Sequence, residues 1–296
     1  MDFAIALQLL LFGVVWGGLY ALIATGLNVI YGVMKILNIA HGELLMLGAY
    51  LTFWLFTLWD VSPLASIPLA GLAMFLVGVV LQKIVIDPVV ARSSSFEASE
   101  KAMLIIFFGV LLIIQNFALL LWSADYRMVN YLTDPVHIGV VSVAANRLVV
   151  ALVALIVTAL MHVTLQYTML GKAIRAVSQD RNTARLMGIN VKQIGLIGFG
   201  IGSALAGIAG SLASTIYVVT PTIGLLFTIK AFTVMVVGGL GSQVGTLVAG
   251  LSLGILESFV GFVIGPEFKD ITGYVLLIGF ILWRARAGAA VGSEVR

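Results

Sequence analysis

Cysteine is absent from this chain of 296 residues, and charged residues make up only 10% of it. Without cysteine the protein has no disulfide, no thiolate nucleophile and no cysteine metal site, and the sequence carries no mark of its redox compartment. Only three histidines are present. His41 stands beside Glu43, whereas His137 and His162 are far away along the chain. One histidine next to one carboxylate is not a metal-binding or catalytic constellation, so the sequence predicts neither an enzyme nor a metal site.

The chain is rich in hydrophobic residues. They make up 61% of the chain, and the mean hydropathy is +1.15, whereas soluble domains are about 45–50% apolar and about 25% charged. A membrane-spanning helix needs about 20 apolar residues. We therefore expect an all-α integral membrane protein, a polytopic bundle of about eight spans forming one transmembrane domain over residues 1–296. The net charge of +3 does not indicate nucleic-acid binding, because the basic residues lie beside the apolar runs, where they orient membrane proteins.

The apolar runs predict where the spans lie. The first run, about residues 3–34, lacks the basic start of a signal peptide and is read as a retained span. It is too long for one straight crossing of a bilayer about 30 Å thick unless it tilts or breaks, and its glycines offer break points. Further spans are expected at about residues 36–56, 62–81, 102–122, 148–166, 194–219 and 271–283, with a split into two helices at 238–245.

Three segments between the spans carry separate expectations. The first helix before the split, about residues 225–237, is too short to cross with ease, so a half-helix or re-entrant segment is expected there. Residues 82–101 contain Pro88 and a serine cluster and predict a surface loop. Short strand-like or interfacial pieces are expected around residues 136–143. The pairs Gly13/Gly17 and Gly250/Gly254 have the small-xxx-small spacing that lets helices approach closely within a bundle.

The distribution of basic residues predicts the orientation. If the polar segment Leu170–Lys192 is cytoplasmic, span alternation leaves four of the sixteen Lys and Arg residues outside or within the membrane, namely Arg127, Arg147, Lys230 and Lys269. The other twelve lie inside: Lys35, Lys83, Arg92, Lys101, Lys172, Arg175, Arg181, Arg185, Lys192, Arg284, Arg286 and Arg296. Cytoplasmic loops are enriched in Lys and Arg, so the N-terminus is expected outside and the C-terminus in the cytoplasm.

The polar segment has a helical pattern of its own. Lys172 to Ser178 is expected to form one short helix, and Asp180 is a plausible N-cap for a second from Arg181 to Met187. Gly188 follows in the C′ position, where glycine commonly ends a helix. A solvated loop that only fixes topology is the alternative reading, but the capped pattern indicates a surface that lies against a partner.

Three sequence blocks resemble one family of transporters. They are LNIAHGELLMLGAY at 37–50, GKAIRAVSQDRNTARLMGIN at 171–190 and KAFTVMVVGGLGSQVGTLVAGLSLGILES at 230–258. In this order they resemble the permeases of high-affinity branched-chain amino-acid ABC importers, a superfamily that also includes permeases for urea and short-chain amides. The loose coupling pattern Glu-Ala-Ala-xxx-Gly of ABC importers falls on Asn182, Thr183, Ala184 and Gly188, with the Glu and the first Ala replaced.

The resemblance implies partners and a division of labour. It implies a second permease subunit, identical or homologous, two cytoplasmic ATPase subunits and an extracytoplasmic solute-binding protein, in a bacterial inner membrane. The chain contains no G-x-x-x-x-G-K-[ST] motif, so ATP and Mg²⁺ are expected on the partner ATPases and no cofactor in this chain. The residues expected to contact the ATPase are those of the coupling loop, about residues 168–192: Lys172, Arg175, Asp180, Arg181, Thr183, Ala184, Arg185 and Gly188.

Polar residues within the apolar runs are candidates for the translocation path, because burying them in lipid is costly. These are Asn28, Asn38, His41, Glu43, Gln115, Asn116 and Glu257. For each of them a helix–helix hydrogen bond is the more common role than a contact with solute, and Glu43 could pair with His41 or Lys35. A second hypothesis, from a different class, is a stand-alone proton-coupled transporter that uses Glu43 and Glu257. The solute and the choice between homodimer and heterodimer are left open by the sequence.

Overall fold

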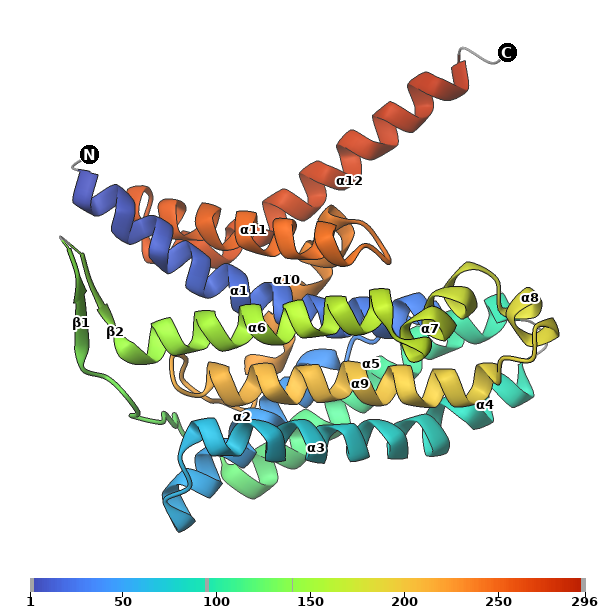
Figure 1. Ribbon diagram of the computed structural model, residues 1–296, viewed down its shortest axis with the longest axis horizontal. Coiled ribbons are helices and arrows are strands. Elements are labelled where there is room, and N and C mark those ends of the chain that lie inside the picture. The colour runs from blue at the N-terminus through green and yellow to red at the C-terminus, as the bar shows by residue number, and fades with distance from the viewer. Residues whose placement is uncertain (1–2, 94–95, 140, 294–296) are drawn as a thin grey trace.

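The structure, a computed structural model, describes residues 3–93, 96–139 and 141–293, so Arg296 lies outside the described part. Most helices run nearly side by side along the long axis of the molecule, and α12 projects away from the bundle (Figure 1). The helices are α1 (Phe3–Met34), α2 (His41–Trp59), α3 (Pro63–Leu81), α4 (Asp87–Arg92), α5 (Phe96–Trp122), α6 (Ala145–Tyr167), α7 (Met169–Gln179), α8 (Arg181–Leu186), α9 (Val191–Ala213), α10 (Ile223–Gly238), α11 (Gln243–Val263) and α12 (Lys269–Ser293).

Seven helices of the described part are long and apolar enough to cross a membrane. The helix α12 adds the apolar stretch that the sequence predicted as the last span. The short apolar helix α10, of 16 residues, and the break after it also agree with the sequence. The all-α polytopic architecture is therefore confirmed.

The helix α1 lies at the centre of the bundle. Its residues 17–30 are all buried, and it packs against α6, α9, α10 and α11. Of the two options for the first run, a tilt or a break, the break at its glycines is wrong, because α1 is continuous over 32 residues. Its glycines serve helix packing instead. A Cβ on Gly254 of α11 would collide with the backbone of Gly13 and Gly17 of α1, so the two predicted pairs meet at one close interface.

The expected surface loop at residues 82–101 is also wrong. A π-helical turn, Gln82–Ile86, joins α3 directly to α4, and α5 begins at Phe96. A proline in a helix leaves one carbonyl without an N–H partner, and π turns and prolines are typical places where a helix changes direction. The wider turn just before Pro88 accommodates the proline, and the chain continues as helix to Arg92.

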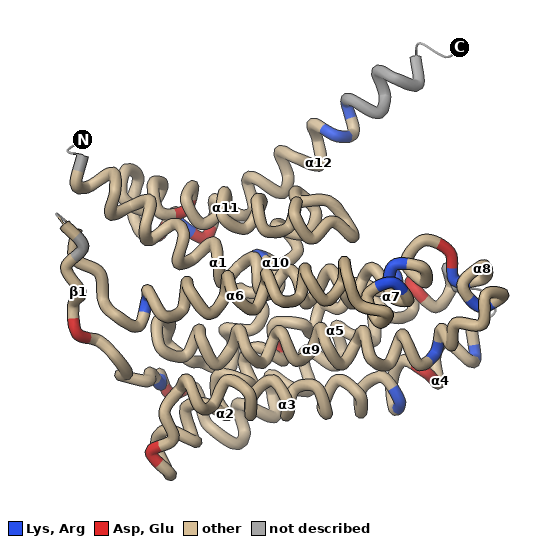
Figure 2. The backbone as a smooth tube through the Cα atoms, in the orientation of Figure 1, with Lys and Arg blue, Asp and Glu red and all other residues tan. Residues whose placement is uncertain are grey.

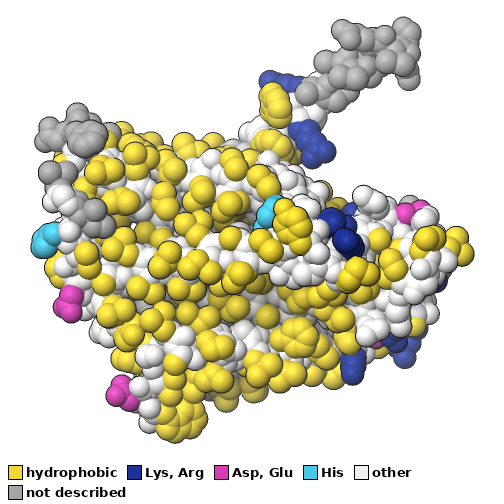
Figure 3. All heavy atoms as spheres, in the orientation of Figure 1, with side chains coloured by type: hydrophobic (Ala, Val, Ile, Leu, Met, Phe, Trp, Pro, Cys, Tyr) yellow, Lys and Arg dark blue, Asp and Glu magenta, His cyan; other side chains and the backbone are white. Residues whose placement is uncertain are grey.

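The two ends of the bundle differ in structure and charge. One end carries the predicted strands, β1 (Pro135–Ile138) and β2 (Val141–Ala144), which pair as an antiparallel hairpin. The opposite end carries α4, α7 and α8, where Lys and Arg gather (Figure 2). The surface between the ends is covered largely by hydrophobic side chains (Figure 3). This distribution is typical of a bundle whose long axis crosses a membrane.

Candidate functional site

The helices α7 and α8 form a capped unit at the basic end. Thr168 caps α7 by accepting a hydrogen bond from the Gly171 N–H at 3.1 Å. The carboxylate of Asp180 caps α8 by accepting from the backbone N–H groups of Asn182 and Thr183 at 2.8 and 3.1 Å. Hydrogen bonds from the Thr183 hydroxyl and these two N–H groups hold the pKa of Asp180 below its usual value.

The predicted end of α8 is confirmed as well. Gly188 has a φ of +83°, the left-handed conformation in which glycine ends helices. The segment Leu170–Lys192 is thus two ordered helices rather than a solvated loop.

The exposed face of this unit combines basic and apolar side chains. Lys172 and Arg185 are exposed, and Leu186 and Met187 beside them are exposed by 88% and 78%. Exposed apolar side chains of this size typically mark contact surfaces. Leu186 was missed in the sequence, although an apolar side chain beside a predicted cap and basic residues was a usable signal.

Two residues predicted to contact a partner face the bundle instead. Ala184 is buried, with 3% of its surface exposed. The guanidinium of Arg175 donates hydrogen bonds to the carbonyl oxygens of Leu165 and Gln166 at the end of α6. Their contribution is therefore to hold α7 and α8 on the bundle. A salt bridge of 3.3 Å between Lys192 and Asp87 also ties this end together, between α9 and α4.

Asn28 of α1 binds the break between α10 and α11. Its Oδ1 accepts from the Gly241 N–H at 2.6 Å, and its Nδ2 donates to the Ser242 carbonyl at 3.2 Å and to the Thr246 hydroxyl at 2.8 Å. The side chain is 1% exposed. The backbone of the break therefore finds hydrogen-bond partners inside the protein, as irregular backbone at membrane depth requires.

The start of α2 carries three fully buried polar side chains. Asn38, His41 and Glu43 are each 0% exposed. The Nε2 of His41 lies 3.1 Å from the Ile23 carbonyl oxygen. The side-chain atoms of Asn38 and both carboxylate oxygens of Glu43 have no hydrogen-bond partner among the residues that the structure describes. The suggested pairing of Glu43 with His41 or Lys35 is wrong for this conformation, and the Lys35 ammonium lies over the Tyr31 ring instead.

Glu257 belongs to a buried network of charges. Its carboxylate accepts from the Lys230 ammonium at 2.7 and 2.8 Å and from the Tyr20 hydroxyl at 2.7 Å. Lys230, which is 3% exposed, also forms a 2.8 Å salt bridge with Asp270 at the start of α12. The two partners on α10 and α11 are 27 residues apart in sequence. Sequence reasoning named both residues but could not pair them.

Gln115 and Asn116, the two path candidates on α5, are not enclosed in the bundle. Asn116 lies on the exposed side of α5, and its amide donates to the Leu112 carbonyl of the same helix at 2.8 Å. Gln115 is only partly buried. A polar side chain on an outward face satisfies its hydrogen bonds within its own helix, which a run of sequence letters does not reveal.

Comparison with known proteins finds relatives by sequence. No solved structure matches the chain. The permease protein BraD of the high-affinity branched-chain amino acid transport system of Pseudomonas aeruginosa is 33% identical, over 94% of this chain and 94% of its own length. The corresponding LivH of Escherichia coli is 31% identical, over 95% of this chain and 94% of its own length. LivM of Escherichia coli is 26% identical, over 90% of this chain and 66% of its own length. The sequence model described as "Branched-chain amino acid transport system / permease component" matches residues 9–281, and the chain belongs to this family of permease components.

Proposed function

We propose that this chain is the permease subunit of a binding-protein-dependent ABC importer that moves branched-chain or related small aliphatic amino acids into the cytoplasm. The observation that carries the proposal is the family match, which spans residues 9–281 and so includes the whole bundle with α7 and α8. The relatives of similar length are named for branched-chain amino acid transport. Carriage of urea or amides has no comparable support.

The basic end faces the cytoplasm in this proposal. The N-terminus then lies outside and the C-terminus inside, in a bacterial inner membrane, because Lys and Arg gather at the end with α4, α7 and α8. The partners are a second permease chain, two cytoplasmic ATPase subunits that hold ATP and Mg²⁺, and an extracytoplasmic binding protein. The ATPase contact is assigned to the half-buried Arg181 and to the exposed residues of the capped unit: Lys172, Thr183, Arg185, Leu186, Met187 and Gly188.

The path is assigned to the polar groups buried among the central helices. Asn28, Asn38, His41 and Glu43 border α1, α2 and the break before α11, and buried polar groups in membrane helices commonly mark solute pathways. Glu257 is assigned a structural role next to the path, because it neutralises the charge of Lys230. The pairing of Glu257 also disfavours the stand-alone proton-coupled transporter, which needs this carboxylate free.

The experiment is ATP-dependent leucine uptake into proteoliposomes that contain the permease, its ATPase subunits and the loaded binding protein. The double variant Arg181→Glu/Arg185→Glu is expected to abolish uptake and the stimulation of ATP hydrolysis by the binding protein. The control Lys83→Glu/Arg92→Glu reverses two charges at the same end of the bundle but outside α7 and α8, and it is expected to transport normally. Normal coupling in the first variant would refute the assigned contact, and uptake without any ATPase would refute the importer.

A further inference from the structure

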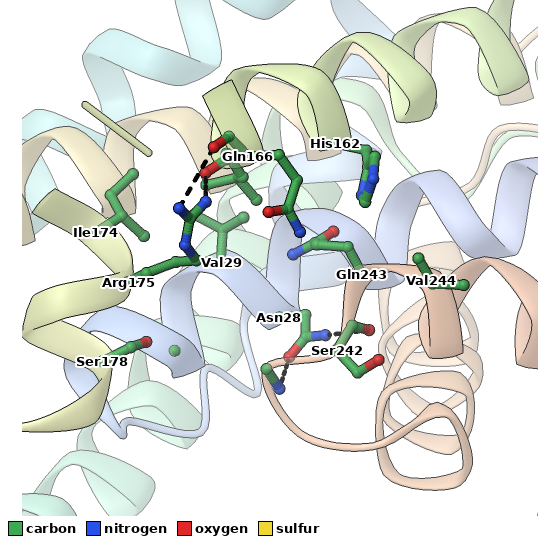
Figure 4. Close-up of a pocket in the computed structure, with 13 residues that line it drawn as sticks. Asn28, Val29, His162, Gln166, Ile174, Arg175, Ser178, Ser242, Gln243 and Val244 are labelled. Carbon is green, nitrogen blue, oxygen red and sulfur yellow. Dashed lines mark hydrogen bonds between the residues drawn. The ribbon is translucent and has the colours of Figure 1, made fainter. Parts of the chain in front are cut away.

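A cavity of about 190 Å³ lies at the basic end, between four segments that are distant in sequence. Its walls come from α1, the end of α6, α7 and the turn before α11 (Figure 4). At about 30 Å³ for each water, this volume holds about six waters, which is the space of one small organic molecule. The cavity is partly open to the outside of the chain.

One side of the cavity carries hydrogen-bond donors with a positive charge. Arg175 uses two N–H groups on the carbonyl oxygens of α6, and a guanidinium has five N–H donors in all. His162 and Gln166 of α6 line the same wall. A guanidinium with free N–H donors, in a wall that also carries an amide, is a suitable site for a carboxylate.

The opposite side offers an acceptor that nothing in the described chain uses. The Oε1 atom of Gln243 is buried and has no hydrogen-bond partner among the described residues. The side chains of Gln243 and Gln166 point toward each other across the cavity (Figure 4). Asn28, in contrast, is occupied by the turn, since both ends of its amide are hydrogen-bonded there. A buried acceptor left without a partner costs about 1–3 kcal/mol, and a ligand with N–H groups would remove that cost.

The lining also includes four aliphatic side chains, beside Ser178 and Ser242. Val29, Leu165, Ile174 and Val244 contribute to the wall, and Leu165 and Ile174 are buried. A cavity that combines an aliphatic wall with a few separated polar groups is typical of sites for small organic ligands.

We propose that this cavity binds the zwitterion of an α-amino acid with a short aliphatic side chain. The carboxylate lies against Arg175, the ammonium group donates to the Oε1 of Gln243, and the side chain contacts the aliphatic wall. The inference rests on the proposed function for its substrate class and adds the place of a site at the cytoplasmic end of the path. A ligand there bridges α7, which continues into the capped helix α8, and the turn that Asn28 holds on α1.

This bridging has a functional consequence. A site at the inner mouth fills from the cytoplasm when the internal amino-acid concentration is high. An occupied site ties α7 to the turn, so a rearrangement that separates them becomes less favourable by the binding free energy. Accumulated amino acid is therefore expected to slow further import.

The test measures binding of radiolabelled leucine to the full-length chain in lipid nanodiscs, without the binding protein. Saturable binding is expected, with norleucine competing and acetate or isobutylamine competing poorly, since each lacks one charged group. Gln243→Leu is expected to weaken binding at least tenfold, equal to about 1.4 kcal/mol. The control Gln193→Leu replaces an exposed glutamine at the same end of the bundle and is expected to bind as the unsubstituted chain does. Val244→Phe, at an exposed position on the rim, is expected to abolish binding by filling the cavity, and it keeps the test informative if Gln243→Leu folds poorly.

The outcomes separate this inference from the proposed function. If intact cells take up leucine through this permease but the chain in nanodiscs shows no saturable binding, the site is refuted and the importer stands. If binding occurs and Gln243→Leu and Val244→Phe leave it unchanged, the site lies elsewhere and the inference is also refuted. A phospholipid headgroup that occupies the cavity, detected by mass spectrometry and not displaced by leucine, would refute it as well. Failure of both uptake and binding for every amino acid would refute the proposed function itself.

Discussion

Lys230 and Glu257 provide a sharp test of how charges are held inside this bundle. The substitution Lys230→Met removes a buried ammonium that contacts both oxygens of Glu257 at 2.7 and 2.8 Å. Glu257 is 0% exposed, so its carboxylate would keep only the hydrogen bond from Tyr20. Removing one partner of a buried ion pair costs about 3–5 kcal/mol, because the other charge is left uncompensated. The Tyr20 hydroxyl offsets part of this cost, so we expect a loss of about 3 kcal/mol.

The opposite substitution is expected to cost less, because the two partners are not equivalent. In Glu257→Leu the ammonium of Lys230 keeps its 2.8 Å salt bridge with Asp270, whose side chain is 50% exposed and therefore partly solvated. The double variant Lys230→Met/Glu257→Leu leaves neither member of the pair. Replacing both members of a buried pair by apolar residues of similar size is often neutral. The predicted order of stability is therefore original chain and double variant above Glu257→Leu, with Lys230→Met lowest.

The assay is reversible unfolding of the purified chain in mixed micelles of increasing SDS content, followed by tryptophan fluorescence. The free energy of unfolding is compared for the four proteins as a double-mutant cycle, which isolates the coupling between the two residues. A suitable control is Lys172→Met, which removes an exposed ammonium from α7 and is expected to change stability by less than about 0.5 kcal/mol. The reasoning is refuted if Lys230→Met is as stable as the control, or if the double variant is no more stable than Lys230→Met.

Three further predictions concern packing, hydrogen bonding and capping. Gly254→Leu is expected to prevent the close approach of α1 and α11, because even a Cβ there meets the backbone of Gly17; the same SDS titration should show a loss of about 3 kcal/mol, the upper end of the usual cost of overpacking, and an unchanged midpoint would contradict the packing. Asn28→Ala removes three hydrogen bonds from the turn before α11 and should cost about 3 kcal/mol at about 1 kcal/mol each; normal protection of the Gly241 amide in hydrogen exchange would contradict this. The Asp180 pKa is lowered by the folded cap, so the cap stabilises α8 above the unfolded pKa and is lost as the pH falls through the folded value; the protection factor of the Asn182 amide, which corrects for the pH dependence of intrinsic exchange, should fall at low pH and in Asp180→Ala at neutral pH, whereas equal protection in that variant would count against the cap.

The sequence predicts the features of this fold that depend on local chemistry. The cap at Asp180 and the helix end at Gly188 follow from residue types at fixed spacing, and so does the break after α10. The error at residues 82–101 is local too, because Pro88 and a serine cluster are turn signals that a π-helical turn and the continuing helix overrode. The sequence shows that a polar residue lies within an apolar span, but it does not show whether the side chain points into the bundle or away from it.

The features that the sequence could not provide depend on contacts between distant helices. Ala184 is buried and Asn116 is exposed because of the helices that pack against α8 and α5. The spacing of apolar residues within either helix does not show which helices these are. The pairing of Lys230 with Glu257 joins two helices across a tight turn. A cavity is still harder to predict from the sequence, since its walls come from four separate segments.

Hydrogen bonds at two levels along α1 hold it to α10 and α11. At one level Asn28 binds the turn between α10 and α11 through three hydrogen bonds. At another, Tyr20 joins the charge network of Lys230 and Glu257, and the two levels are about 12 Å apart at 1.5 Å per helical residue. Between and beyond them the glycine faces of α1 and α11 leave backbone against backbone. Hydrogen bonds thus fix α1, α10 and α11 together at both levels, and α6 and α7 face this unit across the cavity, where α7 leads directly into α8.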